Sequence, residues 1–408
     1  METSTGPCKD VLYNPDLLGI ICRFLREPAA TFISRHRLGG HGKKPLRLGF
    51  DIQELLPKLK KLIVEDFAAD PSIPLLDEVG IVIPSDPRKA DMASMSIWTV
   101  GWKVPGLRSL TLFTDYNHGA RAWVLREPAH IFDSLPHLLQ LRTLIIKTHS
   151  VDLSFLGSLS SLPHLAVLQV SVAQHGQPQK SLPQLAFPSL KSLHVEAYVS
   201  LMPTILKLTP QGSLTSLTYR NDADKEIFNP ADSVQFHAEI ASRFPSLTSL
   251  TLNYCRYRYR PEDSEKNRES LRAAMHPLYD LSKLREMTYL GVPCVDDDAV
   301  ELATSWPEIR SLRIGSLCGT SPTYGILAVL AKHCPLLTDL EMPITFPKKI
   351  VPLRDDAVFS HRLHTLSIDS AMVDFQPAEK GPQWDRVRYI VLKECQPARW
   401  NQLQRLRR

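Results

Sequence analysis

Four stretches of the sequence contain side chains whose types and spacing could support chemistry. Residues 296–298 are three consecutive aspartates that could hold a cation, and His361 and His364 are close enough in sequence to share a metal ion. Residues 255–260 read CRYRYR, and such rings and guanidinium groups can stack on a single-stranded nucleic acid. Residues 35–47 contain five basic residues and no acid, a pattern found in nuclear-import and nucleic-acid-binding segments.

Each stretch also has a simpler structural explanation. Acidic residues are favourable at a helix start, and the aspartates begin a predicted helix over residues 296–306. His364 lies within a strand motif, and CRYRYR fits an edge strand and exit loop with its bases in solvent. The basic residues alternate with glycines, as in a solvated linker. We therefore expect no metal site and no cofactor, and we do not expect nucleic-acid binding.

The motifs of the common enzyme sites are absent. The sequence has no Gly-rich phosphate loop, no HExxH, no GxSxG and no paired cysteines at zinc spacing. It predicts a protein that is not an enzyme, although dispersed catalytic residues would escape this test.

The elements that must position any site come from a repeat. FPSLKSLHV begins at Phe187 and FPSLTSLTL at Phe244, and both follow the pattern Pro-x-Leu-x-x-Leu-x-apolar. Twelve copies, some without the proline, have their first apolar residue at positions 59, 107, 141, 165, 190, 214, 247, 284, 309, 337, 363 and 387. Most steps are 24 to 28 residues, as in leucine-rich repeats. The 48-residue step from 59 to 107 could hide a degenerate repeat.

The spacing inside the motif predicts strand, turn and helix. Leu-x-Leu alternates with period two, which places both apolar side chains on one face of a short strand. Proline can open a strand and ends the helix before it. Helices are predicted over residues 233–244, 270–281, 296–306 and 321–334. One repeat cannot bury enough apolar surface alone, so neighbouring repeats must stack. The predicted fold class is α/β: a leucine-rich-repeat solenoid, an irregular ribonuclease-inhibitor-like horseshoe, with a short N-terminal helical segment.

Two further segments resemble a known family. PDLLGIICRFL, from Pro15, is similar to the opening of the F-box in fungal F-box/leucine-rich-repeat proteins, and AKHCPLLTDLEM, from Ala331, resembles their cysteine-containing repeats. The second half of an F-box contains a tryptophan, and here none precedes Trp98, so the resemblance implies a truncated or degenerate F-box. The resemblance implies docking on the Skp-type adaptor of a cullin ubiquitin ligase. It assigns adaptor binding to Pro15, Leu17, Leu18, Ile21 and Leu25. The alternative is a helix that caps the apolar end of the solenoid.

Composition and charge also limit the expected compartment and oligomeric state of the protein. The seven cysteines are scattered without a CxxC pair, which indicates free thiols in a reducing compartment, and the net charge of +5 is mild. No transmembrane segment is expected. We expect an intracellular protein, cytoplasmic or nuclear, and a monomer by itself. The predicted division is an F-box-like remnant (1–27), a basic linker (28–54), the solenoid (55–396) and a basic tail (397–408).

The strand pattern also names the residues that point away from the core. These would line the concave face and bind a protein substrate. The candidates are His194, Glu196, Thr218, Arg220, Thr251, Asn253, Arg313, Glu341, Asp369 and Lys393. We expect a non-catalytic protein-binding subunit, which the resemblance extends to a substrate receptor of a Skp–cullin–F-box ubiquitin ligase. The alternative is a free-standing leucine-rich-repeat scaffold with no ligase link.

Overall fold

The computed structural model describes a series of short segments that contain the strands and most of the helices. The described residues are 31–34, 61–64, 77–83, 104, 106–114, 135–147, 151, 153–160, 162–172, 187–221, 230–254, 273–291, 294–315, 321–323, 325–344 and 365–368. The chain divides into two compact units. Unit 1 comprises Met1–Ser171 and His175–Leu190, and unit 2 comprises Val172–Gln174 and Lys191–Arg408.

Unit 1 contains parallel strands, each paired with the next along the chain. Its strands are β1 (Thr31–Ser34), β2 (Lys61–Val64), β3 (Glu78–Ile83), β4 (Ser109–Thr114), β5 (Thr143–Lys147) and most of β6 (Val167–Val172). The 3-10 helix η2 (Leu135–His137) precedes β5, and α6 (Leu153–Leu159) connects β5 to β6.

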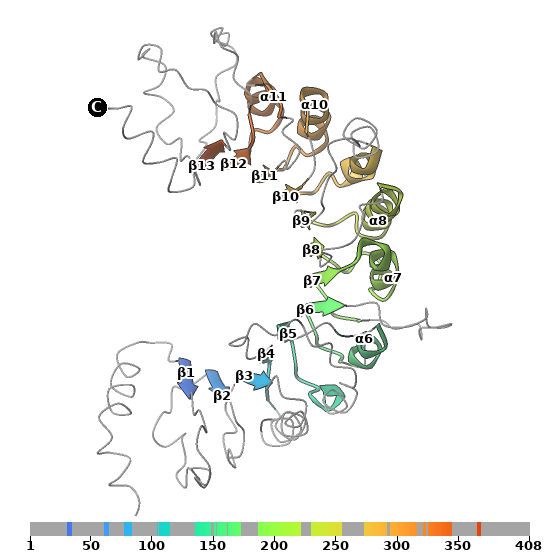
Figure 1. Cartoon of the computed structure of the whole chain (residues 1–408), viewed down its shortest axis with the longest axis vertical. Coiled ribbons are helices and arrows are strands. Elements are labelled where there is room, and N and C mark those ends of the chain that lie inside the picture. The colour runs from blue at the N-terminus through green and yellow to red at the C-terminus, as the bar shows by residue number, and fades with distance from the viewer. Residues whose placement is uncertain are drawn as a thin grey trace, which may run out of the picture. The chain divides into compact units, whose positions relative to one another are not determined.

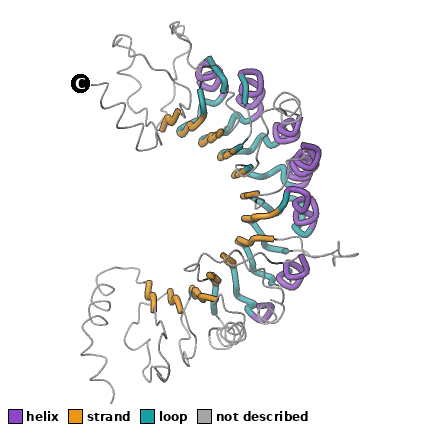
Figure 2. The backbone as a smooth tube through the Cα atoms, in the orientation of Figure 1, coloured by secondary structure: helices purple, strands orange, loops and turns teal. Residues whose placement is uncertain are grey.

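Unit 2 repeats the same arrangement of parallel strands with helices between them, as Figures 1 and 2 show. Its strands are β7 (Ser192–Ala197), β8 (Ser216–Asn221), β9 (Ser249–Asn253), β10 (Glu286–Leu290), β11 (Ser311–Gly315), β12 (Asp339–Met342) and β13 (Thr365–Ile368). Its helical elements are η3 (Val199–Leu201), α7 (Met202–Lys207), α8 (Pro230–Arg243), η5 (His276–Asp280), α10 (Asp296–Ser305) and α11 (Ile326–His333). The α-helices lie on one side of the strands, and the opposite side of the sheet is here called the open face (Figure 1).

The core consists of equivalent apolar residues aligned across the strands. Within unit 2 the parallel pairs join Leu217 to Leu250, Leu250 to Met287, and onward to Leu312 and Leu340. All five side chains are at most 1% exposed. Burying such a side chain contributes about 2 kcal/mol, and each is buried only because neighbouring repeats cover it. The predicted α/β leucine-rich-repeat solenoid is therefore confirmed.

The prolines of the motif have a different position from the one predicted. In the Phe244 repeat, the N–H of Leu247 donates to the carbonyl of Phe244 at 3.0 Å, which closes a four-residue turn with Pro245 at its second position. Proline suits that position because its fixed φ matches the turn. The strand begins only at Ser249. Proline therefore does not open the strand, but it does follow the end of the helix, since α8 ends at Arg243.

The degenerate repeat that the long step suggested is present. Strand β3 lies between positions 59 and 107 and pairs with β2 on one side and β4 on the other. Its sequence, LDEVGIV from Leu76, keeps the apolar-x-x-apolar-x-apolar spacing without proline. Strand β1 lies within the range 28–54 that the sequence suggested as a linker, and it pairs with β2. The twelfth predicted repeat, at position 387, lies outside the described residues.

Two predicted helices differ from the observed ones. Within the predicted 270–281 helix, η5 is a 3-10 helix with Pro277 in its first turn. Proline lacks the N–H that an α-helix would need there and clashes with the preceding turn. The predicted 321–334 helix begins only at Ile326, after Gly325. The predictions over 296–306 and 233–244 agree with α10 and α8 to within a few residues.

Candidate functional site

The open face of unit 2 is built from rows of equivalent residues on adjacent strands. Thr218, Thr251 and Thr288 are partners in the parallel register of β8, β9 and β10, and we call them the hydroxyl row. Adjacent strands place such residues about 4.8 Å apart. All three side chains are half-buried. The row therefore offers evenly spaced hydroxyl groups, each able to donate and accept a hydrogen bond.

Backbone hydrogen bonds at the start of each strand fix the register of these rows. The carbonyl of Thr215 accepts hydrogen bonds from the N–H groups of Thr248 and Ser249, at 2.9 and 3.1 Å. It also accepts one from the Thr248 hydroxyl at 3.0 Å. Arg310 and Thr338 repeat this pattern three strands further along, where the Thr338 hydroxyl donates to the Arg310 carbonyl at 3.0 Å. The sheet is thus a regular frame, and its open-face side chains hold fixed relative positions.

Charged residues border the hydroxyl row and interact with one another. Arg313 continues the row on β11, and its Nε lies 3.1 Å from Glu341 Oε1 on β12. On the other side, Arg220 Nε lies 3.9 Å from Glu196 Oε1 on β7. Both pairs are partly exposed, so solvent screens them and they contribute little to stability. A charged partner can therefore separate them at small cost.

The structure places most predicted partner-binding residues together on this face. Alternate strand positions of β7 to β12 carry His194, Glu196, Thr218, Arg220, Thr251, Asn253, Arg313 and Glu341. Asp369 and Lys393 lie outside the described residues. The predicted adaptor-binding residues, Pro15, Leu17, Leu18, Ile21 and Leu25, lie outside them as well.

A buried cluster that the sequence did not reveal supports the middle of this face from below. Nδ1 of His237, on α8, donates to the carbonyl of Ala274 at 2.7 Å, so the other ring nitrogen, Nε2, accepts from the Tyr254 hydroxyl at 2.7 Å. The Tyr219 and Phe236 rings meet edge to face, with centroids 5.0 Å apart. Burial lowers the pKa of His237 to about 4, although the Ala274 carbonyl opposes this shift. The imidazole is therefore neutral at pH 7, which makes one ring nitrogen a donor and the other an acceptor.

The sequence carried a signal for this cluster. Phe236 and His237 occupy the same apolar stripe of α8 as Ile240 and Phe244, at helical spacing of three and four residues. A histidine on such a stripe indicates a core position rather than a ligand. Its partners could not be predicted, because Ala274 is 37 residues further along the chain.

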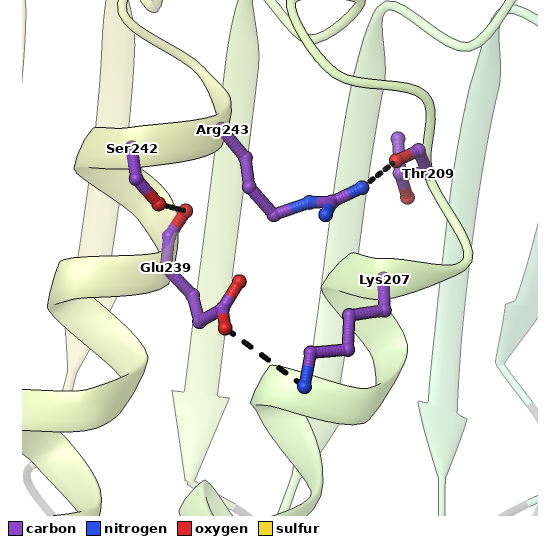
Figure 3. A network of polar contacts seen from close by, with 5 residues as sticks. All are labelled: Lys207, Thr209, Glu239, Ser242 and Arg243. Atoms are coloured by element: carbon purple, nitrogen blue, oxygen red, sulfur yellow. Dashed lines mark hydrogen bonds and ion pairs between the residues drawn. The ribbon is translucent and has the colours of Figure 1, made fainter.

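Polar contacts on the helical side have a structural role. Figure 3 shows Lys207 of α7 with its Nζ 3.9 Å from Glu239 Oε1 of α8, and Arg243 Nη2 donating to the Thr209 carbonyl at 2.8 Å. The Arg243 contact satisfies a carbonyl just beyond the end of α7. These contacts tie α7 to α8.

The three aspartates form a helix start, as their simpler explanation predicted. The Asp298 carboxylate accepts a hydrogen bond from the N–H of Val295 at 3.1 Å, and Asp296 accepts one from the N–H of Thr323 at 2.6 Å. Among the described residues, no group of three or more His, Cys, Asp or Glu side chains could hold a metal ion. The other three stretches, residues 35–47, residues 255–260 and His361 with His364, lie outside the described part of the chain. In that part, no helix is long and apolar enough to cross a bilayer.

The comparisons with known proteins found similar solved structures but no family. No protein-family model matches the sequence, and no curated protein matches it either. Among solved structures, the chain is similar to an internalin (inlF) from Listeria monocytogenes at 14% identity, covering 90% of this chain and 99% of that one with a TM-score of 0.40. It is similar to the leucine-rich repeat-containing protein LegL7 from Legionella pneumophila at 13% identity, 68% and 89% coverage and a TM-score of 0.36. A Bacteroides fragilis protein matches at 16% identity, 66% and 68% coverage and a TM-score of 0.38. The in-register strands, turns and helices described above are what make this chain a leucine-rich-repeat solenoid.

Proposed function

We propose that this chain is a non-catalytic protein-binding scaffold that holds its partner on the open face of unit 2. The observation that carries the proposal is the hydroxyl row, which Arg313 continues at one end and His194 at the other. The charged pair Glu196 and Arg220 lies in the adjacent row. Small hydroxyl side chains let another backbone approach closely, and they can pair with its N–H and C=O groups. The binding surface is rigid because backbone hydrogen bonds fix each strand start, so little ordering is needed on binding.

The charged pairs at the border supply selectivity. A partner carboxylate near Arg313, or a partner cation near Glu341, would replace an existing surface pair with an intermolecular one. Complementary charge at such a border chiefly raises the association rate and suppresses wrong partners. Binding should therefore weaken as salt concentration rises, while the contacts made by the hydroxyl row should not.

Affinity purification with face variants tests this proposal. The double substitution Thr251→Arg and Thr288→Arg covers the hydroxyl row with two long side chains and keeps the surface hydrophilic. The control is Ser242→Arg, at an exposed position on α8. Proteins captured by the wild type and by Ser242→Arg should be lost with the double variant. Recovery of the same proteins by all three chains would show that binding does not use the open face.

A second candidate function is favoured by one sequence observation. The PDLLGIICRFL segment resembles the start of an F-box, which supports a substrate receptor of a Skp–cullin–F-box ubiquitin ligase. In this version residues 1–27 hold the adaptor and the repeats select the target. The test is co-purification of a Skp-type adaptor with the full chain. Leu18→Asp or Ile21→Asp should abolish it, and equal recovery without residues 1–27 would remove the ligase role.

A further inference from the structure

The open face of unit 1 has a different chemistry from that of unit 2. Phe113 of β4, Ile145 of β5 and Val167 of β6 occupy alternate strand positions on the side opposite the buried leucines. All three are half-buried rather than part of the core. We call these three residues the apolar diagonal.

Folding does not require apolar residues at these positions. In unit 2, the motif position of Ile145 is occupied by Thr218, Thr251 and Thr288, and the strands pair in the same register. The core of β5 is supplied instead by Leu144 and Ile146, which are 0% and 2% exposed. Contiguous apolar side chains on a surface that the fold does not need are typical of a binding site.

The register of the strands sets the geometry of the apolar diagonal. Ile145 pairs with Thr111 on β4, which is two residues before Phe113, and with Gln169 on β6, which is two residues after Val167. The three apolar residues therefore form an oblique line, with steps of about 7–8 Å between diagonal neighbours. Side chains on one face of an extended peptide repeat about every 6.7 Å, whereas those on one helix face are about 5–6 Å apart. The spacing fits an extended segment with apolar residues at alternate positions.

Positive charges lie at both ends of β5. Lys147 is exposed, and its Nζ lies 5.8 Å from the centroid of the Phe113 ring, within the range of a cation–π contact. Arg142 is exposed just before the strand and forms no ion pair with any described residue. Five residues of strand separate the two cations by about 17 Å. Lys147 thus provides a cation on the face of Ile145, and Arg142 provides a second one just before the strand.

We propose that the open face of β4 to β6 binds an extended, acidic peptide segment whose alternate apolar side chains contact Phe113, Ile145 and Val167. Its carboxylates pair with Lys147 and Arg142. This surface lies on unit 1 and uses none of the residues proposed above for unit 2, so the two proposals can fail independently.

The test is selection from a random-peptide phage library on the purified full chain. The selection uses the wild-type chain alone, and the Lys147→Glu variant, which changes an exposed side chain, is kept for the affinity measurement. The enriched peptides should combine alternate apolar residues with Asp or Glu. Their affinity, measured by fluorescence anisotropy, should fall at least about tenfold with Lys147→Glu, a loss of about 1.4 kcal/mol. Ile145→Thr should weaken binding as well, and it should fold because threonine occupies the same motif position in unit 2.

Two controls and three outcomes complete the design. Lys283→Glu reverses another exposed lysine, on unit 2, and should leave peptide affinity unchanged, as should the double arginine variant of the hydroxyl row. The proposal is overturned if no enriched peptide is sensitive to Lys147→Glu, or if the enriched peptides are basic or show helical spacing. It is also overturned if light scattering shows a dimer that Ile145→Thr dissociates, because the surface would then serve self-association.

Discussion

Acidification from pH 7 to pH 5 should destabilise this protein through one buried histidine. His237 is fully buried, and burial lowers its pKa from 6.5 to about 4. In the unfolded chain the imidazole takes up a proton as the pH falls through 6.5, whereas in the folded chain it stays neutral until about pH 4. The unfolded state therefore binds more protons in this window, so stability rises with pH there. The contribution is fully present above pH 6.5 and is lost as the pH falls toward 4.

The magnitude follows from the two pKa values. Each pKa unit of difference corresponds to about 1.4 kcal/mol, and only the part of the window above the working pH counts. Between pH 7 and pH 5, the free energy of unfolding should fall by about 2 kcal/mol from this residue alone. Protonation also changes its contacts, because a charged imidazole can no longer accept a hydrogen bond from the Tyr254 hydroxyl.

The assay compares urea unfolding of the wild type and of His237→Gln across this pH range at constant ionic strength. Glutamine cannot titrate but keeps one donor and one acceptor for Ala274 and Tyr254. The variant is expected to be less stable at pH 7 and to lose about 2 kcal/mol less than the wild type on acidification to pH 5. Hydrogen exchange of the α8 amides should report the same loss locally. Parallel pH dependences for the two chains would refute the reasoning, since other groups would then account for the entire slope.

Three further predictions concern the repeats. Burial raises the pKa of Cys334 to about 12, and its thiol lies 3.5 Å from the Ala303 carbonyl. Iodoacetamide should therefore alkylate it at pH 8 only after urea unfolds the chain, and rapid alkylation of the native protein would contradict this burial. Gly212 has φ of +74°, so Gly212→Ala should lower stability by about 1 kcal/mol, whereas Gly106→Ala, also with open space around the added carbon, should cost less. Leu144→Ala should cost about 2–5 kcal/mol by thermal unfolding, whereas Ile145→Thr on the next position should stay within about 0.5 kcal/mol.

The sequence contained most of the strand positions because each is specified by a local pattern. In the repeat that contains β9, Leu247, Leu250 and Leu252 are all fully buried, as the leucine spacing predicted. Strand β3 was harder to find because it has Val79 and Ile81 in place of the leucines. Its position is determined by pairing with β2 and β4, which is a tertiary interaction that the local sequence does not contain. The local pattern therefore predicts only those strands whose motif is still recognisable.

The start of α11 shows why helix boundaries were harder to predict from the sequence than strand positions. Ser321 and Pro322 have the residue types of a cap and a first helical position, but the helix begins four residues later. The N–H of Thr323 donates instead to Asp296, at the start of the preceding repeat's helix, 27 residues earlier in the chain. A contact across repeats thus replaces the local cap. No sequence window of helical length contains both partners.

The same limit applies to the candidate site, whose residues follow from the strand pattern but whose pairings depend on tertiary contacts. The two-residue period of the strands sufficed to identify open-face residues such as Thr251 and Glu341, since successive side chains point alternately to the core and to the open face. It could not reveal that Glu341 faces Arg313, because these two residues are 28 positions apart and variable insertions separate the repeats. The apolar diagonal was visible in principle, since Ile145 lies between two buried residues, Leu144 and Ile146. Only the register of the strands shows that its three residues form one oblique line.

The repeat thereby separates the requirements of folding from those of binding. Each strand fixes its buried residues through neighbours on both sides, so those positions converge on leucine. The intervening positions make no comparable contribution to the core. The row that carries Thr218, Thr251 and Thr288 in unit 2 carries Thr111, Ile145 and Gln169 in unit 1. Solubility alone would favour hydroxyls in both units, because exposed apolar groups on a strand promote association. Neither folding nor solubility therefore accounts for the isoleucine, valine and phenylalanine on unit 1, which is why we propose a bound peptide as the reason for them.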